Sequence, residues 1–186
     1  MRKFAKYLYI FFSFCFVFYA LLSIPSFPPP ARDFLQSEEP ADVETPLRKA
    51  YFTNLTRAEV IEHYNQVYKN KFFGFSFPNV RLNYPPEEAQ TIIRDQTRST
   101  FLEELVYPLR SSLYINGFEP KEEKDKIIVN GQDWRQKVTV RYVPSPAPAR
   151  VIVALIIIAF VPLLTNMLVR LAKDYYSLLS KNIVKK

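Results

Sequence analysis

The residues of this chain that could carry out chemistry are few, and the only imidazole is that of His63. A Ser–His or Cys–His mechanism would have to use it, because such mechanisms need a base beside the nucleophile. The sequence contains no Gly-x-Ser-x-Gly motif, and no nucleophile lies near His63. His63 falls at the edge of the apolar face of a predicted helix, which indicates a surface or boundary position.

Adjacent carboxylates occur at three places in the chain: Glu87–Glu88, Glu103–Glu104 and Glu122–Glu123. A general acid–base pair must converge across a cleft, with its carboxyl groups about 5–10 Å apart in glycosidases. Neighbours on one helix or turn point apart instead. The three pairs therefore favour roles at a helix dipole or on a solvated face.

Cofactor and metal chemistry has few residues available. Three glycines leave no glycine-rich phosphate loop, and one Cys with one His does not supply a Cys/His zinc site. We therefore expect no catalytic residue, no cofactor-binding residue and no metal ligand. The sequence leans away from an enzyme and leaves the question open.

Two positions raise the question of covalent modification. Cys15 lies in the middle of a long apolar run, where a packing role is favoured over lipidation, because palmitoylated cysteines lie near the membrane interface. Asn54-Leu55-Thr56 matches the glycosylation sequon. Thr56 has a competing role as a helix cap, so we interpret the sequon as a chance match.

Two long runs without charge frame the chain, at residues 7–24 and 151–169. A helix of about 20 residues spans a hydrocarbon core about 30 Å thick, so both runs predict transmembrane helices. A cleaved signal peptide is the alternative for the first run, but the run is longer than an h-region and no A-x-A-like site follows it. A buried core helix is the alternative for the second run, which is unusually long and uncharged for that role.

The formal charge of +7 is concentrated at the two ends. Residues 1–6 carry +3, residues 170–186 carry +4 and Arg150 carries +1, which leaves −1 for residues 25–149. By the positive-inside rule, both termini are cytoplasmic and residues 25–149 are extracytoplasmic. We therefore expect a two-pass protein of the cell or plasma membrane, with membrane lipid as a partner. Nucleic acid is not an expected partner, because the central region is close to neutral.

The apolar runs and the C-terminal tail carry two further patterns. Residues 170–186 place apolar side chains on one arc and charged ones opposite, which predicts a cytoplasmic amphipathic basic helix that lies in the membrane interface or packs on a partner. Within the second run, Pro162 leaves the carbonyl of Ile158 without its helical donor. We expect the two spans to pack together, with Asn166 bonding to Ser13 or to a backbone group.

Proline-rich segments flank the central region. Residues 25–49 contain six prolines and several acids, which predicts a semi-rigid linker, and residues 144–150 predict an extended spacer before the second run. Residues 50–143 remain as the extracytoplasmic domain, which is long enough for one modest core.

The first half of this domain contains two predicted helices and a strand. Thr56 and Glu59 form a capping box for a helix that ends near residue 69 or 70, and Val60, Ile61 and Tyr64 lie on its apolar face. Residues 80–84 alternate as a half-buried strand does, with Val80, Leu82 and Tyr84 on the inward face. A second helix begins after two prolines and runs from residue 87 to about residue 96.

The second half predicts mainly strands. Residues 101–115 fit either a helix or a strand. Because proline is disfavoured inside a helix and inside a central strand, Pro108 leads us to expect a short helical turn followed by an edge strand. Asn116-Gly117 predicts a turn, and Asn130-Gly131 predicts a hairpin. Residues 134–142 predict a strand that has one buried and one solvated face. The fold class is therefore α+β, with two helices on a small, mainly antiparallel sheet between two transmembrane helices.

The layout resembles that of the polysaccharide co-polymerase, or chain-length determinant, family. The resemblance lies in the two spans, the outer α/β domain and the proline-rich approach to the second span, VPSPAPARVIVALIII. It covers only the ends of the chain, and no functional residue is transferred from it. We expect an outer domain that binds or scaffolds a protein partner, or a second copy of this chain, in an envelope or surface assembly. The alternative is a membrane-anchored enzyme, or a regulatory subunit, of cell-envelope polysaccharide synthesis or export.

Overall fold

The computed structural model describes residues 2–22, 26–67, 70–72, 75–77, 79–92 and 98–184. The chain divides into two compact units. One contains Met1–Leu22 and Pro146–Lys186, and the other contains Ser23–Ser145.

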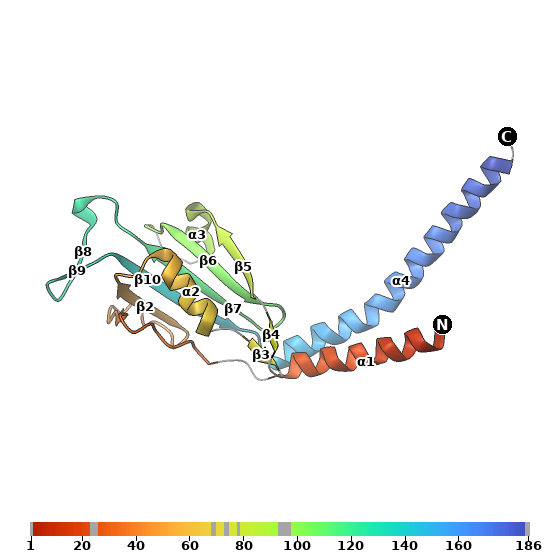
Figure 1. Ribbon diagram of the computed structural model, residues 1–186, viewed down its shortest axis with the longest axis horizontal. Coiled ribbons are helices and arrows are strands. Elements are labelled where there is room, and N and C mark those ends of the chain that lie inside the picture. The colour runs from red at the N-terminus through yellow and green to blue at the C-terminus, as the bar shows by residue number, and fades with distance from the viewer. Residues whose placement is uncertain are drawn as a thin grey trace. The chain divides into compact units, whose positions relative to one another are not determined.

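The first unit is a pair of helices, α1 (Arg2–Leu21) and α4 (Ala147–Val184) (Figure 1). Both are long and apolar enough to cross a membrane, over Lys3–Leu21 and Ala147–Ser177. The side chain of Arg150, near the start of α4, donates a hydrogen bond of 3.1 Å to the carbonyl of Leu22, where α1 has ended. The two helices therefore run antiparallel, and the prediction that they pack together is confirmed.

The contact in the middle of this pair is made by a residue that sequence reasoning did not single out. The hydroxyl of Tyr9 on α1 donates to the carbonyl of Ile158 on α4. This is the carbonyl that Pro162 deprives of its helical donor. Asn166, which the sequence suggested for the contact, is exposed.

The second unit is built on a six-stranded sheet in the order β1-β2-β10-β7-β6-β5. Every neighbouring pair in it is antiparallel. Its strands are β1 (Leu35–Gln36), β2 (Arg48–Thr53), β5 (Val80–Tyr84), β6 (Phe101–Tyr107), β7 (Ser111–Phe118) and β10 (Gln136–Pro144). Two hairpins lie outside the sheet, β3 (Asn70–Phe72) with β4 (Phe75–Phe77), and β8 (Ile127–Val129) with β9 (Gln132–Trp134).

The helices α2 (Arg57–Val67) and α3 (Pro86–Ile92) cover opposite faces of this sheet (Figure 1). Tyr64 of α2 packs in the main core with Leu105 and Val140, whereas Ala89 of α3 packs on Leu102, which points the other way from β6. The predicted α+β class with a mainly antiparallel sheet is confirmed. The last turn of the second predicted helix, at residues 93–96, lies outside the described residues, as does the end of the first.

The capping box of α2 forms as its sequence predicts. The Glu59 carboxylate accepts 2.7 Å hydrogen bonds from the backbone N–H and the hydroxyl of Thr56. The backbone hydrogen bond, followed by that of the hydroxyl, lowers the pKa of Glu59. A cap of this kind satisfies donors that the first turn of a helix leaves free.

The prediction for residues 101–115 was wrong. No helical turn or edge strand forms there, because β6 and β7 are long interior strands joined by a tight turn. Pro108 and Leu109 occupy the centre of that turn, which the Arg110 N–H closes on the Tyr107 carbonyl at 2.9 Å. Leu109 has a φ of 60°. Proline followed by a positive φ is the pattern of a type II turn, so Pro108 marks a connection between strands.

Asn116 and Gly117 were also predicted wrongly as a turn. Both lie inside β7, where Asn116 pairs with Thr139 and Gly117 pairs with Val138. An Asn-Gly dipeptide permits a turn but does not require one, and here the flanking apolar residues pair on both sides.

The proline-rich segment before the domain is more ordered than a linker. It contains β1, which pairs with β2, and Phe27 and Phe34 pack against the main core. Asp42 in the same segment is buried and lies 2.7 Å from the ammonium of Lys137. The predicted solvated face of β10 is therefore partly covered. On the other side of the domain, the spacer is shorter than predicted, because α4 begins at Ala147.

The strand predicted at residues 80–84 is present as β5, but the prediction of its burial was wrong. Val80 and Leu82 are exposed, because β5 is the last strand of the sheet. Its other face carries Arg81 and Asn83, which lie beside buried Glu103 of β6. Alternation therefore identified the strand without identifying the covered face.

Candidate binding pocket beside the β8–β9 hairpin

The candidate site is formed where the chain leaves the main sheet between β7 and β10. A short 3-10 helix, η1 (Glu123–Asp125), leads into the β8–β9 hairpin. Asn130 and Gly131 form the two-residue hairpin turn with φ values of 55° and 75°, as their sequence predicted. The hairpin places Ile127 opposite Trp134, so one apolar and one aromatic side chain meet at its base.

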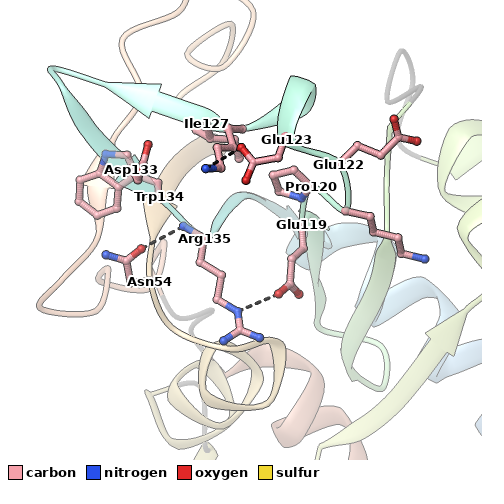
Figure 2. A pocket seen from close by; sticks show the side chains of 11 residues that line it. Asn54, Glu119, Pro120, Glu122, Glu123, Ile127, Asp133, Trp134 and Arg135 are labelled. Carbon is pink, nitrogen blue, oxygen red and sulfur yellow. Dashed lines mark hydrogen bonds and ion pairs between the residues drawn. The ribbon is translucent and has the colours of Figure 1, made fainter.

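A pocket of about 420 Å³ lies between this hairpin and the segment that follows β7 (Figure 2). Its walls come from four parts of the domain: the β2–α2 connection, the segment after β7, η1 and the hairpin. The lining residues are Asn54, Glu119, Pro120, Lys121, Glu122, Glu123, Lys126, Ile127, Asp133, Trp134 and Arg135.

Arg135 organises the floor of the pocket. Its Nε donates to Glu119 Oε1 at 2.8 Å, and its backbone N–H donates to Asn54 Oδ1 at 2.9 Å. Figure 2 shows the side chain extending from the bend between β9 and β10 toward Glu119. These contacts join segments that lie 16 and 81 residues apart in the sequence.

The rim of the pocket carries further ion pairs. Lys126 Nζ lies 2.7 Å from Glu123 Oε2, and Lys124 Nζ lies 2.7 Å from Glu122 Oε2. The hydrogen bond with Glu123, then its charge and more weakly the charge of Asp133, raise the pKa of Lys126. These side chains are largely exposed, so solvent screens the pairs and each contributes little to folding. They are available to exchange partners with a charged ligand.

Trp134 provides a different kind of contact surface. Its indole Nε1–H is buried and has no hydrogen-bond partner among the residues that the structure describes. A buried indole N–H normally has an acceptor, so Trp134 departs from the usual pattern. Together with Pro120 and Ile127, the ring gives the pocket an apolar wall beside its charged rim.

Several of the charged side chains that line the pocket are already paired. The carboxylates of Glu119, Glu122 and Glu123 are each paired with a cation. Within the described part of the chain, no group of three or more His, Cys, Asp or Glu residues is placed to hold a metal ion. The pocket therefore offers matched charges beside an apolar wall.

His63 lies away from this pocket, on α2. Its Nε2 is 3.1 Å from the carbonyl of Pro29, and its ring lies near the rings of Phe34 and Tyr64. The side chain is half-buried, as the boundary position predicted. His63 thus connects the proline-rich segment with α2.

The three acid pairs have separate surroundings. Glu87 and Glu88 lie in the first turn of α3, where the helix dipole favours them, as predicted. Glu122 and Glu123 lie at the pocket. Their convergence with residues of other elements was missed, although the charged run EPKEEKDK before the hairpin was a visible signal.

The solvated role predicted for Glu103 was wrong, because its side chain is fully buried. It pairs with Arg57 of α2 and with Arg81 of β5, whose Nε lies 2.8 Å from its Oε2. Burial raises the pKa of Glu103, but the hydrogen bonds and charges of Arg81 and Arg57 together lower the pKa below its ordinary value.

Glu104 was also wrongly predicted to be solvated, and it points to the opposite face of the sheet. Its carboxylate accepts a hydrogen bond from the hydroxyl of Tyr84, and this bond is the largest cause of the raised pKa of Tyr84. The two neighbouring acids do point apart, as expected for residues on one strand.

The two candidate modification positions have ordinary surroundings. Cys15 is exposed on α1 as a free thiol. Asn54 is exposed between β2 and α2, with its side-chain oxygen bonded to Arg135, and the hydroxyl of Thr56 is bonded to Glu59.

Comparison with models of known protein families, with curated proteins and with solved structures finds no match for this chain.

Proposed function

We propose that this chain is a two-pass membrane protein whose sheet domain is an extracytoplasmic binding module. The pocket beside the β8–β9 hairpin would take a polar segment of a partner in an envelope or surface assembly. The observation that carries the proposal is the pocket itself, with solvent-exposed ion pairs on its rim beside an apolar wall that includes Trp134. Two helices able to span a membrane flank the domain that contains it.

The distribution of charge supports the orientation. Residues 1–6 carry +3 and residues 170–186 carry +4, and positive flanks favour the cytoplasmic side. The antiparallel packing of α1 and α4 supports the proposal, because two crossings with both termini on one side would need it.

Cysteine labelling tests this orientation. In a Cys15→Ser background, Lys121→Cys should react with a membrane-impermeant maleimide in intact cells that express the protein. Lys173→Cys should react only after the membrane is permeabilised. Equal labelling of both positions in intact cells, or release of the protein by alkaline carbonate, would contradict a two-pass arrangement.

Site-specific photo-crosslinking tests the pocket. Lys121 lines the pocket and forms no ion pair with any residue that the structure describes, so it tolerates a benzophenone side chain. We expect an adduct from position 121 in native membranes, and none from Glu87, which is exposed on α3. Trp134→Ala should reduce the adduct. Equal adducts from both positions would show that the pocket is not the contact.

A membrane-anchored enzyme, or a regulatory subunit, of envelope polysaccharide synthesis or export is the second candidate. The observation in its favour is that two carboxylates from separate parts of the domain, Glu119 after β7 and Asp133 of β9, line one pocket with Arg135. If the protein in detergent cleaves or transfers an envelope polysaccharide, Asp133→Asn should abolish turnover while the crosslink from position 121 persists. A parent protein without turnover, whose crosslink from position 121 is reduced by Trp134→Ala, would favour the binding role alone.

A further inference from the structure

β5 is the last strand of the main sheet, beside β6 (Figure 1). In an antiparallel pair, alternate residues direct their N–H and C=O groups toward the partner strand, and the residues between them direct theirs away. Val80–Tyr84 pair with β6 alone, and no backbone hydrogen bond joins their other side to any residue that the structure describes. β5 therefore presents a row of donors and acceptors at the spacing that another strand needs.

The opposite edge of the sheet is protected in a way that β5 is not. β1 contains only two residues, and residues 38–40 follow it with two acids and a proline. Short edge strands, charges and prolines are common means by which sheets prevent unwanted pairing. β5 contains five residues and no proline, and its one charged residue, Arg81, is held by buried Glu103. An added strand therefore meets fewer obstacles at β5 than at β1.

One face of β5 presents apolar side chains to an incoming strand. Val80 and Leu82 lie on this face and are 49% and 40% exposed. Glu104 lies across from Leu82 on the same face, but it is buried and accepts a hydrogen bond from the hydroxyl of Tyr84. Side chains of an added strand are stabilised beside Val80 and Leu82 when they are apolar too.

The other face of β5 has an excess of positive charge. Arg57 of α2 and Arg81 of β5 share one carboxylate, that of Glu103, so two positive charges face one negative charge. The two arginine side chains are 39% and 48% exposed, whereas that of Glu103 is fully buried. Asn83, also on this face, accepts a 2.7 Å hydrogen bond from Arg57 and adds no charge. A carboxylate on an added strand would match the remaining positive charge, and a cation would be repelled.

We propose that the β5 edge binds an extended segment of a partner protein, in which apolar and acidic residues alternate. The segment adds to the sheet as a further strand, with its backbone bonded to β5, its apolar side chains beside Leu82 and an acid beside Arg81. The β5 strand of a second copy is not this occupant, because it contains no acid and brings another Arg81 to the same face. This surface is separate from the pocket beside the β8–β9 hairpin.

Hydrogen exchange of the full chain in mild detergent tests strand addition. The probe is a short synthetic peptide in which valine and glutamate alternate. It should slow amide exchange several-fold in Val80–Tyr84 and leave exchange in β1 unchanged. Two control peptides should bind several-fold more weakly by fluorescence anisotropy. One carries lysine in place of glutamate, and the other keeps the side chains but is N-methylated at alternate residues, which removes its backbone donors.

Substitutions in the protein locate the binding site. Val80→Asp places a carboxylate against the valines of the probe and should weaken its binding several-fold. Val43→Asp is the matched control, because Val43 is 45% exposed and lies outside the edge, and it should bind the probe as the parent does. Trp134→Ala, in the pocket, should also leave this binding unchanged.

Four outcomes would overturn the proposal. Equal binding of the N-methylated peptide, or slowed exchange only outside Val80–Tyr84, would contradict strand addition. Equal binding of the lysine peptide would contradict the acidic character of the segment. Loss of binding in Trp134→Ala but not in Val80→Asp would assign the peptide to the pocket. Light scattering at twice the mass of one chain, with Val80–Tyr84 protected without any peptide, would show that a second copy occupies the edge.

Discussion

The ring of Phe101 lies directly on Gly117, its register partner on the neighbouring strand β7. A Cβ at position 117 would stand 2.0 Å from Cε1 of that ring, where no real contact exists. The guanidinium of Arg57 lies over the same ring, 5.0 Å from the ring centroid. Arg57 also pairs with buried Glu103. The absence of a side chain at Gly117 thus allows the ring to lie flat and hold this group of residues together.

Gly117→Ala should therefore destabilise the domain strongly. The Phe101 ring is buried, so the ring or the strand must shift to admit a Cβ, and we expect a loss of about 2–3 kcal/mol in the free energy of unfolding. Urea unfolding of the full chain in detergent measures this, with Trp134, the only tryptophan, as the fluorescent probe.

Gly131→Ala is the matched control for this substitution. Nothing lies within 4 Å of a Cβ there, but its φ of 75° strains any L side chain, by about 1 kcal/mol. A loss at position 117 no larger than that at position 131 would contradict the role of the Phe101 contact.

Glu103→Gln should weaken the domain and change its response to acid. The amide keeps the shape but loses the charge that faces Arg57 and Arg81, and we expect a loss of about 1–3 kcal/mol at neutral pH. Both arginines are partly exposed, so water offsets part of this effect. The same unfolding assay, read at pH 7, measures the difference.

The sign of the acid response follows from the lowered pKa of Glu103. Its ordinary value is 4.5, and the folded value is lower, so its contribution is fully present above about pH 4.5. The contribution is lost as the pH falls through the folded pKa. Between neutral pH and pH 3, stability should therefore fall less steeply in Glu103→Gln than in the parent. Identical slopes in the two proteins would contradict this interpretation.

Tyr9→Phe should weaken the α1–α4 pair only when Pro162 is present. The phenylalanine cannot donate to the carbonyl of Ile158, and hydrogen bonds of this kind within membranes contribute about 0.6 kcal/mol on average. In a Pro162→Ala background, the new backbone N–H supplies that donor, and Tyr9→Phe should then have almost no effect. Titration of the four proteins from mild detergent into sodium dodecyl sulfate gives the coupling. A loss of equal size in both backgrounds would count against it.

Leu109→Gly should leave the domain as stable as the parent or stabilise it by up to about 1 kcal/mol. Leu109 holds a φ of 60° in the β6–β7 turn, which strains a leucine but not a glycine. The greater freedom of glycine in the unfolded chain offsets part of the gain. Leu113→Gly, in the buried interior of β7, should instead lose several kcal/mol. A comparable loss at both positions would contradict the strained turn.

The sequence predicted those elements whose signals are local. The Thr56–Glu59 capping box, the Asn130-Gly131 hairpin and the two apolar helices depend on residues within one turn or one run, and all are present. The α+β class followed from them. Local chemistry alone determines such features, so no knowledge of distant residues was needed.

The errors arose where a distant residue decides the outcome. By its local sequence, Gly117 could form part of a turn. It lies in a strand instead, where the ring of Phe101, sixteen residues earlier, covers it. Glu103 and one face of β10 were expected to be solvated. Both expectations were wrong, because Arg57 approaches Glu103, and Asp42 approaches β10, from other parts of the chain. The pocket could be seen in the sequence only as a run of charges, since its floor depends on Arg135 meeting Asn54.

The pairing of β2 with β10 also has a consequence for the order of events during synthesis. Arg48 of β2 pairs with Arg141, so the middle of the sheet cannot close until nearly the whole domain has been made. β10 ends at Pro144, and α4 begins only three residues later. Such long-range pairing is slow. Until it is complete, the unpaired strand edges can pair with other chains. The nascent domain therefore stays incomplete until the second apolar helix is about to emerge, and it is most exposed to chaperones and proteases during that interval.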